Sequence, residues 1–207
     1  SIKKKNPNIQ LALGPKYLAL NKKFFELKKK AKSREKIKKI MIFFGGSDKL
    51  NLTEKILLIP KLFKKIQFLI VIGDLNSNKK KITEISKKYK NINLFCGVTN
   101  EKMAKIVNQS DLAIGAGGVN LSERSYLGLP SIVISASKNQ LLNIKNFEKK
   151  GMIINLGINN SYTNDKVVDS ISFLIKNNNK FKKFSINCLN SLKENHNNNH
   201  LKRLFSL

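Results

Sequence analysis

The feature that most constrains this fold is a regular alternation of short apolar runs with segments of helical spacing, which begins near residue 37. The predicted strands are 39–44, 68–73, 91–96, 111–118, 131–136 and 152–157. The predicted helices are 53–63, 80–89, 101–108, 121–127, 140–150 and 165–176, and Pro60 is expected to kink or end the first of them. This order predicts an α/β fold, a doubly wound, Rossmann-like parallel sheet of about six strands.

We divide the chain into three parts on this basis. Residues 1–36 do not resemble the start of a domain, and we interpret them as a connector with a remnant of an N-terminal domain. Residues 37–177 form the predicted Rossmann-like domain, and residues 178–207 a terminal helix with a polar tail. An apolar content of 41% over 207 residues is enough for a sizeable core.

The formal net charge of +27 raises the hypothesis of a module that binds nucleic acid or anionic lipid. Lysines are spread along the whole chain, however, and only three of the forty basic residues are arginine. Arginine is the residue that phosphate and base recognition favour, so this pattern indicates a solvated lysine surface and no nucleic-acid partner. Attraction to an anionic ligand or a membrane remains an alternative, for which the lysines at 22–23 and 28–30 are candidates.

No apolar run approaches the roughly 18 residues of a membrane span, and the first residues carry no hydrophobic signal segment. We therefore expect a cytoplasmic protein, and a monomer. Cys96 and Cys188 match no metal or redox spacing, and we expect isolated buried thiols. No metal and no cofactor are predicted.

Two glycine-rich segments follow predicted strands, FFGGSD at 43–48 and IGAGGVN at 114–120. Ligands of open parallel sheets bind beyond the carboxyl ends of the strands, where glycines let backbone amides approach an anion. A phosphate or diphosphate is the ligand that such loops suit, although tight turns also use glycine for structural reasons alone. Neither segment matches the dinucleotide fingerprint or the P-loop, which argues against an NAD enzyme and an NTPase.

Polar side chains near these loops have two interpretations each. Glu123 follows the second loop early in its helix, where it either stabilises the helix N-terminus or accepts the hydroxyls of a ribose. Asn139 and Gln140 follow the fifth strand and either cap the next helix or hydrogen-bond a sugar.

Several segments in this order resemble the nucleotide-binding half of GT-B proteins. They are FFGGSD, AIGAGG with SERSYLGLP, NQ at 139–140 and the helix that ends in KKG at 149–151. The resemblance is strongest to the PseG-type UDP-2,4-diacetamido-2,4,6-trideoxy-β-L-altropyranose hydrolases of pseudaminic acid biosynthesis and their spore-coat polysaccharide relatives. LGPKYLALNKKFFELK at 13–28 is similar to the segment that joins the two domains of that family. MurG-type glycosyltransferases share the last three segments.

The resemblance implies a UDP-sugar in a cleft between two Rossmann-like domains. It assigns Glu123 to the ribose, the backbone of Gly117, Gly118, Val119 and Asn120 to the diphosphate, and Gly46 and Ser47 to the phosphate and sugar. It further assigns main-chain contacts with uracil to Val98 and Thr99, and positioning of the sugar to Asn139 and Gln140.

The chain departs from the hydrolase family at its catalytic group. That family activates water with a histidine of the N-terminal domain, whereas His196 and His200 lie in an asparagine-rich tail and match no such motif. We therefore predict no catalytic residue in this segment, which alone should hydrolyse a UDP-sugar poorly. The predicted function is the nucleotide-binding part of a UDP-sugar hydrolase in surface polysaccharide biosynthesis, and the alternative is a MurG-type glycosyltransferase.

Overall fold

The computed structural model describes residues 20–191 of the chain. The strands are β1 (Lys39–Phe43), β2 (Gln67–Ile72), β3 (Ile92–Cys96), β4 (Leu112–Gly115), β5 (Ser131–Ser135) and β6 (Ile153–Ile158). The helices are α2 (Lys22–Lys28), α3 (Leu52–Lys55), η2 (Ile59–Leu62), α4 (Lys79–Lys87), α5 (Asn100–Gln109), α6 (Val119–Tyr126), η3 (Lys138–Gln140), α7 (Leu141–Lys149), α8 (Asn164–Lys176) and α9 (Asn178–Ser191). His196 and His200 lie outside the described residues.

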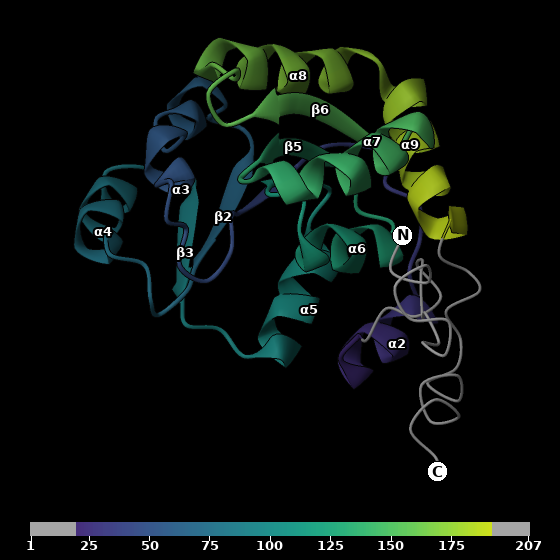
Figure 1. Cartoon of the computed structure of the whole chain (residues 1–207), viewed down its shortest axis with the longest axis horizontal. Helices are drawn as coiled ribbons and strands as arrows, with labels where there is room; N and C mark the ends of the chain where they lie inside the picture. The colour runs from purple at the N-terminus through teal and green to yellow at the C-terminus, as the bar shows by residue number, and fades with distance from the viewer. Residues whose placement is uncertain (1–19, 192–207) are drawn as a thin grey trace, which may run out of the picture.

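All six strands are parallel and lie in the order β3-β2-β1-β4-β5-β6. Figure 1 labels β2 and β3 in one half of the sheet and β5 and β6 in the other. The chain moves outward from β1 to β3, crosses back through α5, and then moves outward in the other direction from β4 to β6. Loops that follow β1 and β4 therefore diverge to opposite sides of the sheet. The predicted fold class, a doubly wound Rossmann-like sheet of about six strands, is confirmed.

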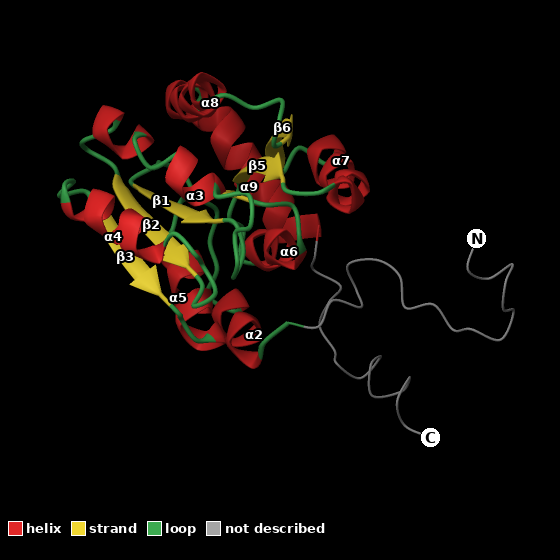
Figure 2. Ribbon diagram, turned by 60° about the vertical axis from the view of Figure 1, so that its left-hand side comes forward, coloured by secondary structure: helices red, strands yellow, loops and turns green. Residues whose placement is uncertain are grey.

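Alternate residues of the central strands face two separate apolar layers. Ile40 and Ile42 of β1 pack in the layer below α3 and α8, whereas Met41 and Phe43 pack in the layer with α5 and α2. This alternation explains why the central strands are continuous apolar runs, since both faces of the sheet are covered by helices (Figure 2). Strand β3 lies at an edge and is only partly buried.

The predicted helix over 53–63 is two separate pieces. Helix α3 ends after a single turn, and η2 is a 3-10 segment with Pro60 in its first turn. The α-helix therefore ends at Lys55, before Pro60, and Pro60 lies in the first turn of η2, where a missing amide proton costs no helical hydrogen bond.

The two ends of the described chain pack against the predicted domain. Helix α2 lies against α5, and Phe24 of α2 is buried in the same apolar layer. Helix α9 contacts both α8 and α6. Its Phe181 is buried in the apolar layer that contains Ile40 and Ile42, and its Cys188 is buried in a separate cluster with Leu121 of α6. The division at residues 36 and 177 stays a prediction, but the parts of the flanking segments that we can describe belong to the same packed body.

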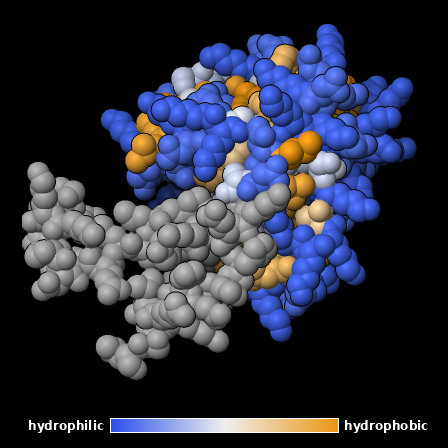
Figure 3. All heavy atoms as spheres, turned by 90° about the vertical axis from the view of Figure 1, so that its right-hand side faces the viewer, coloured by the Kyte–Doolittle hydropathy of each residue, from blue (hydrophilic) through white to orange (hydrophobic). Residues whose placement is uncertain are grey.

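The surface of this body is strongly basic. No lysine among residues 20–191 is buried, and the face seen in Figure 3 is mainly hydrophilic with small hydrophobic areas between charged side chains. The ammonium group of Lys28 is not simply solvated, because its Nζ donates hydrogen bonds to the backbone carbonyls of Tyr126 and Leu189. In the part of the chain that we describe, no helix has the length and apolar character needed to cross a bilayer.

Candidate functional site

The two glycine loops follow β1 and β4, the neighbouring strands between which the strand order reverses. This position is the switch point of the sheet. Phe43 at the end of β1 pairs with Gly115 at the end of β4, so the chain leaves both strands side by side. From this point β1 leads to α3 on one side and β4 leads to α6 on the other. Doubly wound sheets bind their ligands in the crevice that such a divergence creates.

The loop after β1 is fixed by its own residues and by β2. Gly45 has a φ of 105°, which a residue with a side chain rarely adopts. Asp48 accepts hydrogen bonds from the amides of Leu52 (3.0 Å) and Thr53 (2.9 Å) and thereby caps α3. The loop also lies tightly on β2, because a Cβ on Gly73 would stand 2.1 Å from the carbonyl oxygen of Gly46.

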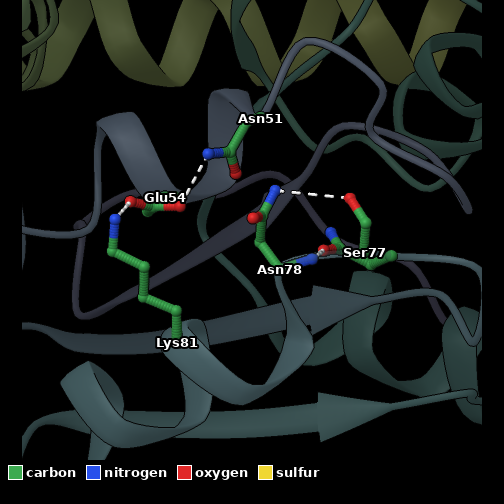
Figure 4. Close-up of polar contacts among 6 residues, drawn as sticks. Asn51, Glu54, Ser77, Asn78 and Lys81 are labelled. Carbon is green, nitrogen blue, oxygen red and sulfur yellow. Dashed lines mark hydrogen bonds and ion pairs between the residues drawn. The ribbon is translucent and has the colours of Figure 1, made fainter.

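A set of polar contacts braces α3 against the start of α4 (Figure 4). The carboxylate of Glu54 accepts a hydrogen bond from Asn51 at 2.6 Å and forms an ion pair with Lys81. These two contacts lower the pKa of Glu54, the hydrogen bond from Asn51 being the larger cause. They join α3, which follows the loop that carries Gly46 and Ser47, to the first turn of α4.

The loop after β4 is held by side chains from the segment that follows β5. Gln140 Oε1 accepts hydrogen bonds from the amides of Gly117 (3.2 Å) and Ala136 (3.1 Å), which ties the two loops together. Asn143 Nδ2 donates to the carbonyl of Gly117 at 3.1 Å. A Cβ on Gly117 would stand 2.3 Å from the side chain of Ile144, so glycine is needed here for packing.

The helix starts at the carboxyl edge of the sheet differ in their caps, and α4, α6 and α7 have no side-chain cap. The N-cap of α6 is Gly118. By contrast, Asp48 caps α3, Thr99 caps α5 and Thr163 caps α8. The first amides of a helix have no acceptor within the helix, and they carry its partial positive charge. The start of α6 can therefore offer amides to an anion.

Glu123 lies one turn further along α6 and is partly buried. Its Oε2 accepts a hydrogen bond from Asn120 Nδ2 at 2.6 Å, so the two side chains share one face of the helix. This contact orients the carboxylate about one turn from the open amides. A carboxylate so placed can accept hydrogen bonds from hydroxyl groups of a ligand whose anionic part contacts the helix start.

A cation lies directly beneath the second loop. The side chain of Arg124 is 1% exposed, and its Nη2 donates to the carbonyl of Ala116 at 2.8 Å. Nε and Nη1 have no hydrogen-bond partner among the described residues. Burial lowers the pKa of this guanidinium to about 10, while the nearby Glu123 carboxylate acts in the opposite direction. At neutral pH the group is charged and its charge is only partly compensated.

A pocket of about 840 Å³ opens beside the start of α6, between that helix and α7. Among the predicted site residues it is lined by Gly117, Gly118, Val119, Asn139 and Gln140. Lys149 and Lys150 also line it, and no carboxylate does. The pocket thus joins the second loop to the Asn139–Gln140 turn in surroundings that suit an anion.

Other predicted residues lie outside this pocket. Gly46 and Ser47 belong to the loop next to it, and Asn120 and Glu123 lie on a different face of α6 from Ser122, which lines the pocket. Val98 and Thr99 follow β3, three strands from β4, which corresponds to roughly 14 Å at the usual strand spacing. The structure therefore places the predicted residues along the carboxyl edge of the sheet and gathers five of them in one cavity.

The sequence interpretation missed three features. It assigned no role to Arg124 or Asn143. No local sequence pattern indicates that Arg124 is buried. It considered Gln140 only as a helix cap or a sugar ligand, whereas the side-chain oxygen joins two loops. Of the two cysteines, Cys188 is buried as expected, but Cys96 is exposed; both are free.

The strand order and the glycine loops after β1 and β4 define a Rossmann-like α/β domain. The chain matches the model of the glycosyltransferase family 28 C-terminal domain over residues 40–202. The chain therefore belongs to this family.

One curated relative and two solved structures are similar to this chain, the structures in fold alone. The spore coat polysaccharide biosynthesis protein SpsG of Bacillus subtilis is 28% identical over 172 residues, which are 80% of this chain and 49% of SpsG. MurG of Acinetobacter baumannii has a similar fold at a TM-score of 0.61 and 16% identity, covering 97% of this chain and 58% of MurG. A UDP-GlcNAc 2-epimerase of Neisseria meningitidis bound to UDP-GlcNAc gives a TM-score of 0.62 at 16% identity, covering 83% of this chain and 45% of the epimerase. The chain spans about half the length of SpsG.

Proposed function

We propose that this domain binds the UDP part of a UDP-sugar at the start of α6. The observation that carries the proposal is the uncapped N-terminus of α6 at the switch point, beside a cavity lined by lysines and no carboxylate. The amides of Gly118, Val119 and Asn120 hold the diphosphate, with Gly46 and Ser47 facing it from the neighbouring loop. Gly117 supports this loop, since both of its backbone polar groups contact side chains.

We place the rest of the ligand by the positions of the other predicted residues relative to the start of α6. Glu123, about one turn from the open amides, accepts the ribose hydroxyls, and the main chain at Val98 and Thr99 contacts uracil. Asn139 and Gln140 line the cavity on the other side of Gly118, where the sugar lies. The epimerase of Neisseria meningitidis, which has a similar fold, is bound to UDP-GlcNAc, and this supports a UDP-sugar as the class of ligand.

We favour hydrolysis of the anomeric C–O bond as the reaction. Water attacks the anomeric carbon, the bond from that carbon to the diphosphate oxygen breaks, and UDP leaves as the free sugar takes up the water oxygen. The amides at the start of α6 stabilise the charge that develops on the departing diphosphate. The similarity to SpsG supports a role in polysaccharide biosynthesis. No described residue is a histidine, and we propose that the group that activates water lies outside the described residues.

Transfer of the sugar to an acceptor hydroxyl is the second candidate, favoured by membership of a glycosyltransferase family and by the MurG-like fold. Incubation of the complete gene product with a UDP-sugar in ¹⁸O-labelled water distinguishes the two. Hydrolysis releases UDP without an acceptor and places the label in the sugar. Release of UDP only when an acceptor is added would overturn the hydrolase proposal in favour of transfer.

Replacing Arg124 by methionine is expected to weaken UDP binding about tenfold without lowering the free energy of unfolding. The guanidinium adds positive charge beneath the diphosphate in surroundings of low dielectric constant. Because its pKa is lowered to about 10, the desolvation cost is fully present at neutral pH and is relieved only as the pH rises through that value. Methionine removes that cost, which offsets the lost bond to Ala116.

Calorimetric titration with UDP and urea unfolding at pH 7 measure the two effects. Arg34→Met is the matched control, since Arg34 also donates to backbone carbonyls but contacts those of Lys32, Asn108 and Ser110. It should leave UDP affinity unchanged. Wild-type affinity in the Arg124 variant would exclude an electrostatic role for this side chain.

A further inference from the structure

A second pocket lies at the opposite edge of the sheet from the α6 start. It has a volume of about 670 Å³ and is bounded by the residues before β1, the segment from the end of η2 to the start of β2, and the junction between α8 and α9. These segments meet at the amino ends of the central strands, whereas the open amides of α6 lie at the carboxyl ends. The pocket is therefore separate from the proposed nucleotide site.

The charge around this pocket has a single sign. Lys36, Lys38, Lys61, Lys64 and Lys65 line it and are all exposed, and no carboxylate lines it. Two carboxylates on neighbouring segments are already paired, one of them with the backbone beside the pocket. Asp111 accepts hydrogen bonds from the backbone amides at 38 and 39, and Glu35 forms an ion pair with Lys182. The rim thus presents five cationic groups to solvent.

The interior of the pocket is apolar and partly open to water. Leu62 is 58% exposed and Ile175 is 39% exposed, while Phe63, which also lines the pocket, is partly buried. Leu62 stands in the chain between Lys61 and the pair Lys64–Lys65. Lysine side chains can extend their ammonium groups away from an apolar surface while their methylene stems cover it. An exposed leucine surrounded by lysines is the pattern of a surface that contacts both acyl chains and anionic headgroups.

We propose that this lysine-rimmed pocket docks the protein on the surface of a membrane that contains anionic phospholipids. The five lysines contact headgroup phosphates, and Leu62 with Ile175 enters the boundary between headgroups and acyl chains. The apolar interior favours this occupant over a free phosphate or a purely polar acidic peptide, neither of which would remove Leu62 from water. With the amino edge on the membrane, the α6 start at the carboxyl edge stays open to a soluble substrate.

The chain has no tryptophan, so one introduced at the pocket reports on that site alone. We expect the emission of the Leu62→Trp variant of the full chain to shift to the blue on vesicles of phosphatidylcholine with phosphatidylglycerol, and not on phosphatidylcholine alone. Leu75→Trp is the control, because Leu75 is 81% exposed on the β2–α4 loop at the opposite edge. No shift for Leu62→Trp, or an equal shift for both variants, would overturn the proposal.

A matched pair of charge variants tests the lysines. Changing Lys61, Lys64 and Lys65 together to glutamine should weaken binding to the anionic vesicles by roughly ten- to a hundredfold in co-sedimentation. The same change at the exposed lysines 79, 80 and 87 of α4 should alter it less than about threefold. Equal losses would show attraction by net charge alone and contradict docking at this pocket. A blue shift of Leu62→Trp with polyglutamate but not with vesicles would replace the membrane by an acidic protein partner.

Discussion

Replacing Glu123 by alanine is expected to weaken UDP binding about a hundredfold and to lower the free energy of unfolding by about 1 to 2 kcal/mol, because this carboxylate also compensates part of the charge of the buried Arg124. In the proposed complex this carboxylate accepts hydrogen bonds from the ribose, and a hydrogen bond to a charged group contributes about 1.5 to 3 kcal/mol. In the free protein its described hydrogen bond is to Asn120, which is near the surface of α6. Isothermal calorimetry with UDP and thermal unfolding measure the two quantities.

Two controls make the Glu123 result specific. Glu84→Ala removes the same charge from an exposed position on α4 and should bind UDP as the wild type does. The ligand 2′-deoxy-UDP lacks one ribose hydroxyl, so the wild type should prefer UDP while the Glu123 variant should bind both equally. If Glu123→Ala retains wild-type affinity, the assignment of the ribose to this residue is wrong.

Replacing Gly73 by alanine is expected to lower the free energy of unfolding by about 3 kcal/mol. The added Cβ would stand 2.1 Å from the carbonyl oxygen of Gly46 and 2.5 Å from its Cα, and a backbone cannot move aside as a flexible side chain does. For a domain of this size such a loss corresponds to a fall in Tm of roughly 6 to 12 °C. Thermal unfolding followed by circular dichroism measures it.

Gly46→Ala is the matched control for this effect. A Cβ on Gly46 meets no atom within 4 Å, and Gly46 is not among the residues with a positive φ. The same methyl group added on the other side of this contact should therefore change Tm by less than about 2 °C. Equal stability of the two variants would show that the close approach of the β1 loop to β2 does not constrain the fold.

Much of the fold could be predicted because each strand has a strong local signal. The run that forms β2 is apolar on both faces, and such a run indicates a strand covered by helices on both sides. The residues at which the helix after β1 divides were harder to predict. The apolar spacing from Ile56 to Leu62 fits a continuous helix, and only Pro60 opposes one. The alternation of elements predicted the class of the sheet but not its strand order, because the position of β4 beside β1 is a long-range contact that no local pattern contains.

The loops of the candidate site could be predicted from the sequence, but the side chains that hold these loops in place could not. Glycines after β1 and β4 are visible in the sequence, and their place at the carboxyl edge follows from a parallel sheet. The double hydrogen bond of Gln140 depends on the position of Gly117, which is 23 residues away in the chain. Burial of Arg124 likewise depends on the packing of α6 under Ala116. Such tertiary contacts are set by the whole fold, so local composition cannot reveal them.

The most direct test of the central claim, that α6 binds a diphosphate with its first amides, is the change in backbone amide NMR shifts on addition of UDP. We predict the largest shifts at Gly118, Val119 and Asn120, because their N–H groups gain anionic acceptors. The amides of Leu52 and Thr53 serve as internal references, since Asp48 already accepts their hydrogen bonds. Saturable shifts confined to those references or to other loops, with the first amides of α6 unchanged, would contradict the account.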